Sequence, residues 1–360
     1  MGAFHEWQGV GTKVGGGYEW FYFDAEHQSG AAIFISIMGP NPFDFTPFGR
    51  RADGKPGTCA ICARAGSPLP QNHYGVAVGG ILPPGSPVPG FEAEGYAHLA
   101  APATEVTFSP APWQLTLPGA TVERSNGCGL PTYSVTIDVS DPDTGCHVVG
   151  QLDFEATHPE WHVPDALLFQ DVNDPAHQHC WAVHVPQARV SGQLTVSAGG
   201  VEIPLPVDQW VGYHDHNWGT HRIADGFGRW IWGRGLLPDG KTVIAASIAP
   251  SLVSGAASQR VPHASVVLSR AGVESEILTL IEPLSPTPPG VTIEVPSMLA
   301  FGVSPPGDGH HVRFDTMLVV PGELPNCYQR RIAKVTLTSA NGDQSEGTGV
   351  TETLMASSFP

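Results

Sequence analysis

The residues from 212 to 219 combine groups that could carry out proton transfer. They read Gly-Tyr-His-Asp-His-Asn-Trp-Gly. Successive side chains of a strand point to opposite faces, so an extended segment places Tyr213, Asp215 and Asn217 on one face. The opposite face then carries His214, His216 and Trp218. Burial would raise the pKa of Asp215 and leave a neutral acid that can donate a proton. The alternative is a purely structural role, in which Asp215 ties two strands together.

Two His-x-His pairs raise the question of a metal ion. They are His177 with His179 and His214 with His216. On a strand, either pair could offer two imidazoles to one zinc ion. No third ligand stands at a suitable spacing in the sequence, so chance pairing among 16 histidines is the favoured explanation and no metal site is predicted.

The cysteines do not complete a metal motif either. Cys59 and Cys62 form one half of a zinc-ribbon pattern without its other half. The six cysteines of the chain are predicted to be free thiols, with one or more disulfides as the alternative.

Composition and charge exclude several classes of partner. The chain has 34 acidic and 17 basic residues, for a formal charge of −17. Nucleic-acid ligands require a positive surface, and an acidic surface repels anionic lipids, so neither partner is predicted. The sequence contains no Walker A loop, HExxH motif or nucleophile elbow. The first ten residues lack a secretory signal and no apolar run could span a membrane, so we expect a soluble cytoplasmic protein without membrane insertion.

The elements that must position these residues are predicted to be short strands. The 360 residues include 43 Gly and 35 Pro, and charged residues make up only 14%. Apolar or alternating segments recur at short intervals between Gly/Pro turns, which is typical of an all-β sandwich or barrel. Strands are predicted at 104–109, 113–117, 133–139, 147–156, 181–185, 189–196, 242–248, 264–269, 276–281, 291–295, 311–319 and 332–338. The best helix candidate is 165–173, and 40–90 is predicted to form long loops.

Four segments resemble motifs of a known family, the carotenoid 1,2-hydratase/AttH-like superfamily. Residues 16–25, GGYEWFYFDA, resemble its GG-x-EWWYFDA opening, with Phe21 in place of the second Trp. Residues 179–189 are similar to its HxW strand and the Pro-x-Ala-Arg that follows. Residues 212–219 resemble its GYHDxNWG signature, and 230–234 its Trp-x-Trp-Gly-Arg.

The resemblance implies two lipocalin-like β-barrel or β-sandwich domains with an apolar cavity at or near their junction. The glycines at 199 and 200 place the boundary between domains 1–195 and 196–360. Family members include hydratases of carotenoid end groups and cofactor-free cyclases, among them Diels–Alderases. The implied partner is a small apolar substrate, and no cofactor is implied. The oligomeric state is left open.

The resemblance also implies the site residues. Its hydratase residues correspond to His179, Trp181, Tyr213 and Asp215, which are predicted to be catalytic, with Asp215 as the acid. Residues predicted to contact substrate are Asn217, Trp230, Trp232, Glu19 and Tyr22. Glu19 is interpreted as mainly structural and requires a partner, for which Arg229 and Arg234 are the candidates, because an unpaired buried carboxylate is costly.

Three functions remain open from the sequence. The first is a cofactor-independent cyclase or isomerase of a polyene, polyketide or terpenoid, because the His-Asn-Trp-Gly after Asp215 is nearer to the AttH-like and cyclase branch. The second is a hydratase that adds water to an isolated alkene. The third is a lipocalin-type carrier without turnover, in which the polar residues of the pocket are dispensable.

Overall fold

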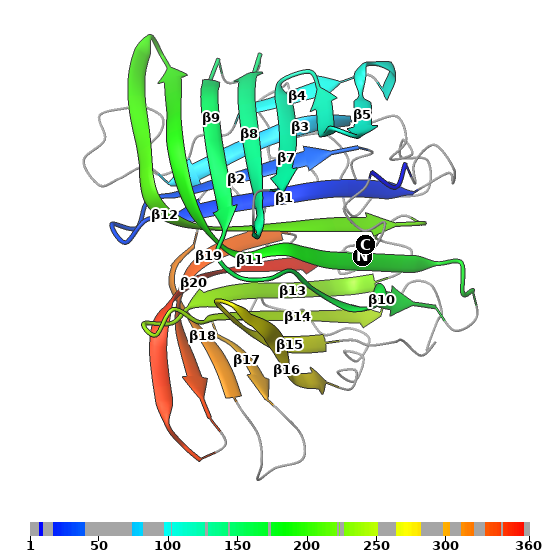
Figure 1. Cartoon of the computed structure of the whole chain (residues 1–360), viewed down its shortest axis with the longest axis vertical. Coiled ribbons are helices and arrows are strands. Elements are labelled where there is room, and N and C mark those ends of the chain that lie inside the picture. The colour runs from blue at the N-terminus through cyan, green and yellow to red at the C-terminus, as the bar shows by residue number, and fades with distance from the viewer. Residues whose placement is uncertain are drawn as a thin grey trace.

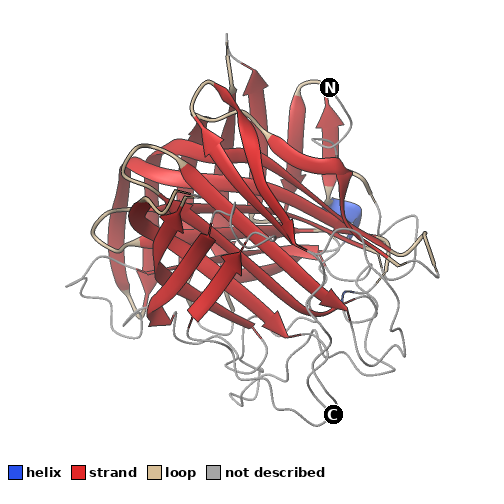
Figure 2. Cartoon of the chain, turned by 90° about the horizontal axis from the view of Figure 1, so that it is seen from below, coloured by secondary structure: helices blue, strands red, loops and turns tan. Residues whose placement is uncertain are grey.

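Two antiparallel sheets account for most of the part of the chain that the structure, a computed structural model, describes (Figures 1 and 2). The described residues are 7–9, 17–39, 74–81, 97–101, 103–126, 129–142, 145–171, 174–221, 223, 227–250, 264–281, 298–302, 311–319, 328–339 and 341–355.

The first sheet has 12 strands in the order β4-β3-β2-β1-β12-β11-β9-β8-β7-β6-β5, with β10 paired to β11 off this path. Its strands are β1 (Tyr18–Glu26), β2 (Ala32–Met38), β3 (Tyr74–Ile81), β4 (Ala97–Ala101), β5 (Thr107–Pro110), β6 (Trp113–Leu117), β7 (Ala120–Asn126), β8 (Pro131–Ser140), β9 (His147–Ala156), β10 (Trp161–Gln170), β11 (Gln178–Ala198) and β12 (Val201–Gly219). A 3₁₀ turn, Ala103–Glu105, precedes β5.

The second sheet has eight strands in the order β16-β15-β14-β13-β20-β19-β18-β17. Its strands are β13 (Phe227–Leu236), β14 (Thr242–Pro250), β15 (Ala264–Arg270), β16 (Val273–Ile281), β17 (Met298–Gly302), β18 (His311–Val319), β19 (Tyr328–Thr338) and β20 (Gln344–Met355). In Figure 1 the two sheets lie one above the other along the long axis of the molecule, with β11 of the first sheet beside β13 of the second.

The all-β prediction is confirmed, and the predicted segments overlap about half of the strands. β6 and β9 coincide with the predicted segments 113–117 and 147–156. The segments 181–185 and 189–196 merge into the long strand β11, which crosses Pro186 through irregular register between Val183 and Ala188. Within the predicted loop region 40–90, residues 74–81 form β3. The predicted strand 291–295 lies outside the described residues.

The predicted helix at 165–173 is wrong. Residues up to Gln170 belong to β10, which pairs with β11, and 172–173 lie outside the described residues. Asp165 and Ala166 both have a φ of 55°, which a right-handed helix does not allow. Pairing with β11 therefore overrides the local helical preference of this segment.

The sheets divide at a different place from the predicted domain boundary. Residues 195 and 196 lie inside β11. Gly199 and Gly200 form the tight turn of the β11–β12 hairpin and are not a linker between domains. The first sheet continues to Gly219, and the second begins at Phe227. The division into two domains stays a prediction, with 220–226 as the position that the sheets favour.

Three large apolar clusters fill the interior. One is formed by residues of the first sheet. The side chains of β1 and β12 that face the second sheet do not belong to it. A smaller one belongs to the second sheet alone, with Val243, Phe314 and Val335 among its members. The third contains residues of both sheets, such as Trp20 of β1 and Trp230 of β13. This third cluster, called here the inter-sheet core, is where the two sheets pack together.

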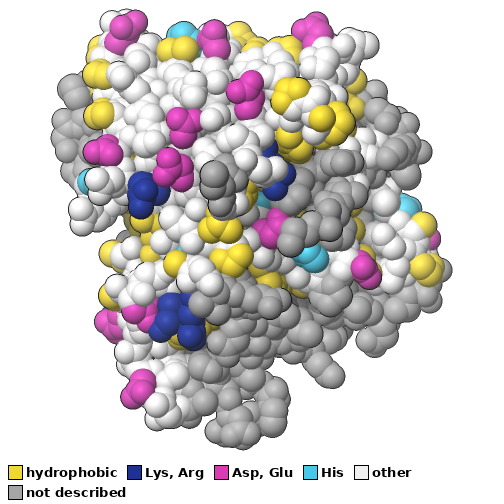
Figure 3. All heavy atoms as spheres, in the orientation of Figure 1, with side chains coloured by type: hydrophobic (Ala, Val, Ile, Leu, Met, Phe, Trp, Pro, Cys, Tyr) yellow, Lys and Arg dark blue, Asp and Glu magenta, His cyan; other side chains and the backbone are white. Residues whose placement is uncertain are grey.

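Acidic side chains are scattered over the face drawn in Figure 3, and few Lys or Arg residues accompany them. This distribution agrees with the formal charge of −17. Within the described residues, no helix is both long and apolar enough to cross a membrane.

Candidate functional site

The candidate site lies on the face of β1, β12 and β11 that meets the second sheet. β12 is the middle strand of the three, and its register aligns side chains in rows across the strands. Tyr22 of β1 lies opposite Asp215 of β12, and Asp24 lies opposite Tyr213. Paired residues point to the same face, so the alternation predicted for 213–217 brings Tyr213, Asp215 and Asn217 into the inter-sheet core.

Asp215 accepts hydrogen bonds from three side chains. The Trp181 indole Nε1–H and the Tyr213 hydroxyl both donate to Oδ2, each at 2.8 Å. The Asn217 amide Nδ2 donates to Oδ1, also at 2.8 Å. All four side chains are buried. The structure therefore brings together three of the four predicted catalytic residues around one carboxyl group, with Asn217 as a further contact.

Burial sets the protonation state of this carboxyl group. Removal from water disfavours the charged form and raises the pKa of Asp215 to about 8. The hydrogen bonds from Trp181 and Tyr213 act in the opposite direction, because they stabilise the carboxylate. Glu352 and Asp24 add negative charge nearby and raise the pKa further. At neutral pH the group is mostly a carboxylic acid, with a conjugate base that three donors already surround.

His179 lies next to this group and is neutral. Burial lowers the pKa of its imidazole to about 3, because removal from water disfavours the charged form. Its Nδ1 lies 2.8 Å from the Tyr18 hydroxyl. Tyr18 and His179 therefore form one polar contact on this face, and Asn217 and Asp215 form another.

Aromatic rings surround these polar side chains. Trp230 packs against Trp20 and His179, with ring centroids 5.5 and 5.2 Å apart. Trp232 lies 5.2 Å from the Tyr213 ring and 5.8 Å from the Tyr22 ring. The predicted substrate-contacting residues Trp230, Trp232 and Tyr22 thus lie beside the candidate acid. Whether they contact a substrate, and whether a cavity exists at this junction, stay predictions.

A buried ion-pair cluster borders the site. Arg234 of β13 bonds to Asp24 at 2.6 Å and also to Glu26, and both carboxylates belong to β1. Arg234 and Asp24 have no exposed surface. Burial raises the pKa of Asp24 to about 7, against the lowering effect of Arg234. Because the cluster joins the two sheets, it fixes β13 relative to β1 at the edge of the site.

Glu19 does not belong to this site. It points to the opposite face of β1, where its Oε1 lies 2.9 Å from His216 Nε2. The backbone N–H groups of Gln8 and Gly9 donate to its two oxygens at 2.6 and 2.9 Å. The expected pairing with Arg234 is wrong, because that arginine faces Asp24 and Glu26, and the Arg229 side chain lies outside the described residues.

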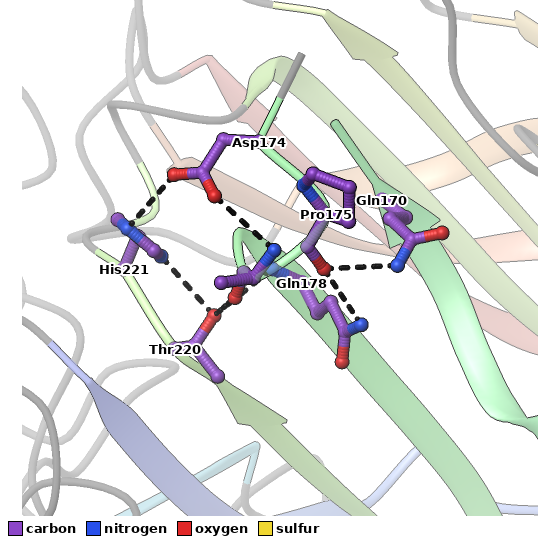
Figure 4. A network of polar contacts seen from close by, with 7 residues as sticks. Gln170, Asp174, Pro175, Gln178, Thr220 and His221 are labelled. Atoms are coloured by element: carbon purple, nitrogen blue, oxygen red, sulfur yellow. Dashed lines mark hydrogen bonds and ion pairs between the residues drawn. The ribbon is translucent and has the colours of Figure 1, made fainter. Parts of the chain in front are cut away.

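The two His-x-His pairs separate from one another. His214 and His216 stack on Phe23 and Phe21 with centroids 3.9 and 4.1 Å apart, inside the first sheet. His177 precedes β11 and stacks on His221 at 4.3 Å. His221 belongs to a polar network at the end of the β11–β12 pair, where Thr220 donates to the carbonyl of residue 176 and Gln178 N–H donates to Thr220 (Figure 4). In the described part of the chain, no three metal-type side chains converge on one point.

Tyr18 and Asp24 are contributors that the sequence analysis did not single out. Both alternate with Trp20 and Tyr22 on β1, and this period of two is a signal that could have placed them on the same face. Their partners His179 and Arg234 could not have been found this way, because each lies more than 150 residues away along the chain.

Comparisons with known proteins identify relatives mainly by fold. No protein-family profile matches the chain. A hydroxyneurosporene dehydrogenase from Chlorobaculum tepidum is 27% identical over 227 residues, which cover 61% of this chain and 53% of the relative. The match thus spans about half the length of that relative.

Two solved structures cover nearly the whole chain. CghA, in a crystal structure with Sch210972, gives a TM-score of 0.57 at 14% identity over 96% of this chain and 89% of CghA. Kievitone hydratase from Nectria haematococca gives a TM-score of 0.51 at 11% identity over 99% of this chain and 94% of the hydratase. The chain therefore has the lipocalin-like fold of these proteins, and the resemblance predicted from its four motifs is confirmed.

Proposed function

We propose that this protein is a cofactor-independent biosynthetic enzyme that cyclises or isomerises an apolar polyene, polyketide or terpenoid, with Asp215 as its proton donor. The observation that carries the proposal is the fully buried Asp215 carboxyl group, which has a pKa of about 8 and three donors directed at it. A carboxylic acid that is neutral near pH 7 suits general acid catalysis.

The hydrogen bonds leave one position for the proton. A carboxyl group has about four acceptor positions, of which Trp181 and Tyr213 occupy two on Oδ2. Asn217 occupies a third on Oδ1. The proton of the neutral acid therefore sits on the remaining position of Oδ1, from which it can reach a substrate atom.

The proposed step conserves mass. The Oδ1–H bond breaks, and the proton forms a C–H bond with an alkene carbon, or an O–H bond with a carbonyl oxygen of the substrate. The resulting cation is attacked by the π electrons of a second alkene in the same chain, which forms a C–C bond. A proton then leaves the product and returns to the Asp215 carboxylate.

The surroundings favour both sides of that step. Three donors stabilise the carboxylate as it forms, and they are in place before the reaction. The faces of Trp181, Trp230 and Trp232 can stabilise a substrate cation. An apolar aromatic environment also limits capture of the cation by water.

Hydration is the second candidate, and His179 favours it. Its imidazole is neutral, with a pKa of about 3, and it lies on β11 two residues before Trp181, which donates to Asp215. A neutral imidazole could orient or deprotonate a water molecule that attacks the cation formed by Asp215. Kievitone hydratase, by its name a hydratase, shares the fold.

The acid can be tested without a known substrate. Infrared difference spectra between pH 5 and 10 should contain a carboxylic C=O band that disappears with a midpoint near pH 8 and is absent from Asp215→Asn. Asp141, a buried aspartate between β8 and β9, provides the control: Asp141→Asn should leave that band in place. An Asp215 that is ionised throughout this range would overturn the proposal.

The reaction type can be tested with two probes, the hydrocarbon polyene neurosporene and a linear triene that carries a carbonyl-activated alkene. Each is incubated with the protein in D₂O and in heavy-oxygen water, and the products are analysed by mass spectrometry. An isomer that gains one deuterium and no oxygen supports acid-assisted cyclisation or isomerisation. A product heavier by one labelled water supports the hydratase, and bound probe that is recovered unchanged supports the carrier.

A further inference from the structure

Arg234 of β13 uses only one nitrogen of its guanidinium group for the ion pairs that border the site. Its Nη2 bonds to Asp24 Oδ1 at 2.6 Å and also to Glu26 Oε1. The Nε and Nη1 atoms carry the other N–H donors, and among the described residues they have no hydrogen-bond partner. Because the Arg234 side chain has no exposed surface, bulk water does not solvate these donors.

Asp24 of β1 has an unused acceptor in the same place. Its Oδ1 accepts from Arg234, whereas its Oδ2 has no hydrogen-bond partner within the part of the chain that the structure describes. Asp24 also has no exposed surface. A buried polar atom without a partner loses its hydration without compensation, and the loss is larger for a charged group. The guanidinium donors and the carboxylate acceptor therefore both require a further bonding partner.

These atoms lie close to the candidate acid. In the register of β1 and β12, Asp24 is opposite Tyr213. Tyr22, two residues earlier on β1, is opposite Asp215, and two residues of a strand span about 7 Å. The Arg234 guanidinium lies over the Tyr213 ring, with Cζ 5.8 Å from the ring centroid. The hydroxyl of the same ring donates to Asp215, so a single tyrosine ring separates the acid from Arg234.

The unused atoms define the chemical group that would satisfy them. A hydroxyl group satisfies both, because its oxygen accepts from the guanidinium and its O–H donates to Asp24 Oδ2. An aldehyde or ketone oxygen only accepts, so it would leave Oδ2 without a donor. A carboxylate would add negative charge to a cluster in which Asp24 and Glu26 already outnumber Arg234. The cluster therefore favours an uncharged hydroxyl group.

We propose that Arg234 and Asp24 form a specificity subsite that binds a hydroxyl group of the substrate while Asp215 acts on the apolar part of the same molecule. The substrate is then a hydroxylated polyene, polyketide or terpenoid and not a pure hydrocarbon. This inference rests on the proposed function, which brings such a chain to the junction of the two sheets. Binding at the subsite can nevertheless be measured without any turnover.

Three probes that share one apolar chain and differ in the head group test the subsite: farnesol, farnesal and farnesoic acid. Their dissociation constants are measured by isothermal titration calorimetry at pH 8, where Asp24, with a pKa of about 7, is mostly ionised. Farnesol should bind at least about tenfold more tightly than farnesal, because only the alcohol donates a hydrogen bond to the carboxylate. Farnesoic acid, which is an anion at this pH, should bind most weakly.

Substitutions at the subsite should change the order of the probes. In Asp24→Asn the amide oxygen can keep the contact with Arg234, and the amide nitrogen replaces the acceptor Oδ2 with a donor, so farnesal should bind at least as tightly as farnesol. Glu26→Gln is the matched control, because it removes the same charge from the same strand and should keep the preference for farnesol. Arg234→Lys keeps the positive charge without the Nε and Nη1 donors, and it should weaken the binding of both farnesol and farnesal. Near-UV circular dichroism establishes that each variant is folded.

The outcomes separate this inference from the proposed function. A wild-type protein that binds farnesol no more tightly than farnesal, or that binds none of the probes, would overturn the hydroxyl subsite. A preference for farnesol that persists in Asp24→Asn would overturn it as well. If the preference is present in the wild-type protein and lost in Asp24→Asn, while Asp215 proves to be ionised from pH 5 to 10, the subsite stands and the acid role fails. If Asp215 titrates near pH 8 but the preference is missing, the subsite fails and the acid role stands.

Discussion

At the scale of single residues, Asp215 is subject to two opposing influences. Burial between the sheets favours its neutral form, and the donors Trp181, Tyr213 and Asn217 favour its anion. Burial dominates, with a pKa of about 8. The result is an acid that is protonated at neutral pH and yet has a stabilised conjugate base, which is the combination that proton transfer requires.

Replacement of Asp215 should show whether this residue donates a proton or only forms hydrogen bonds to the substrate. Asp215→Asn keeps the size and the hydrogen-bonding capacity but cannot transfer a proton, so turnover should fall by about 10²–10⁴ with folding intact. Asp215→Ala should reduce turnover at least as much. In a mechanism that uses only shape and hydrogen bonding, Asn would retain most of the rate and Ala would not. Wild-type rates in Asp215→Ala, measured by product formation, would place the site elsewhere.

The pH dependence of turnover should follow the acid form of Asp215. With a pKa of about 8, the rate should be constant at neutral pH and fall tenfold per pH unit well above 8. A rate that rises with pH through this range would indicate that the carboxylate, acting as a base, is the active form.

The raised pKa of Asp215 should also change how the free energy of unfolding depends on pH. A carboxyl group with a raised pKa in the folded state binds a proton that the unfolded chain has lost, so folding stability declines as pH rises from about 4 to about 8. The free energy of unfolding of Asp215→Asn relative to wild type should therefore increase by about 1.4 kcal/mol per pH unit across this window and level off above it. Urea unfolding at a series of pH values measures the slope, which a constant packing defect would not alter. A flat difference would mean that Asp215 is ionised in the folded protein.

At the scale of elements, β1 divides two kinds of interior. Its face toward the second sheet carries Tyr18, Trp20, Tyr22 and Asp24, and its opposite face carries Glu19 among the aromatic residues of the first sheet. Each face has its own buried carboxylates with their own partners. The ion pair between Asp24 and Arg234 therefore ties β1 to β13 without involving the other face.

Removal of the cation from this pair should be costly. Arg234→Met would leave Asp24 and Glu26 buried without their ion-pair partner, which should lower the free energy of unfolding by about 3–5 kcal/mol at pH 8. Because protonation of the orphaned carboxylates relieves the penalty, the loss should shrink toward pH 5. The exposed pair of Arg313 and Asp315 supplies the control, and Arg313→Met should cost less than about 1 kcal/mol. Equal losses in the two variants would contradict the bridging role of Arg234.

The candidate site could be predicted from the sequence only where it depends on alternation within one strand. The shared face of Tyr213, Asp215 and Asn217 follows from the period of two in β12. The contact of Asp215 with Trp181 was available only through the family resemblance, because the two residues belong to different strands.

Elsewhere, pairing with distant strands decided the outcome. The segment from Asp165 to Gln170 looks helical when read alone, but β11 recruits it into the sheet. Glu19 clearly needed a partner, yet the choice between His216 and Arg234 depends on which face of β1 it occupies. Local patterns therefore predicted the all-β class and about half of the strands, but they predicted the cross-strand partners poorly.

At the scale of the whole molecule, the inter-sheet core links the two sheets. Its members include residues of β1, β11 and β12 on one side and of β13 and β14 on the other. Neither sheet buries these residues alone, so the sheets should lose structure together. We expect far-UV circular dichroism, which reports strands, and near-UV circular dichroism, which reports aromatic packing, to follow one coincident urea transition. Two separated transitions would show that each sheet is an independent folding unit.

Tyr18 reaches His179 by passing over Gly219 of β12, and this crossing has a consequence for the evolution of this protein. The Tyr18 ring can occupy its position only if residue 219 has no side chain, because a Cβ at 219 would lie 2.3 Å from the tyrosine ring. Mutations at the two positions should therefore be inherited as a pair. Among homologous sequences, those with a larger residue at 219 should have replaced the tyrosine at 18 with a shorter side chain, and a covariation analysis of the two columns would reveal it.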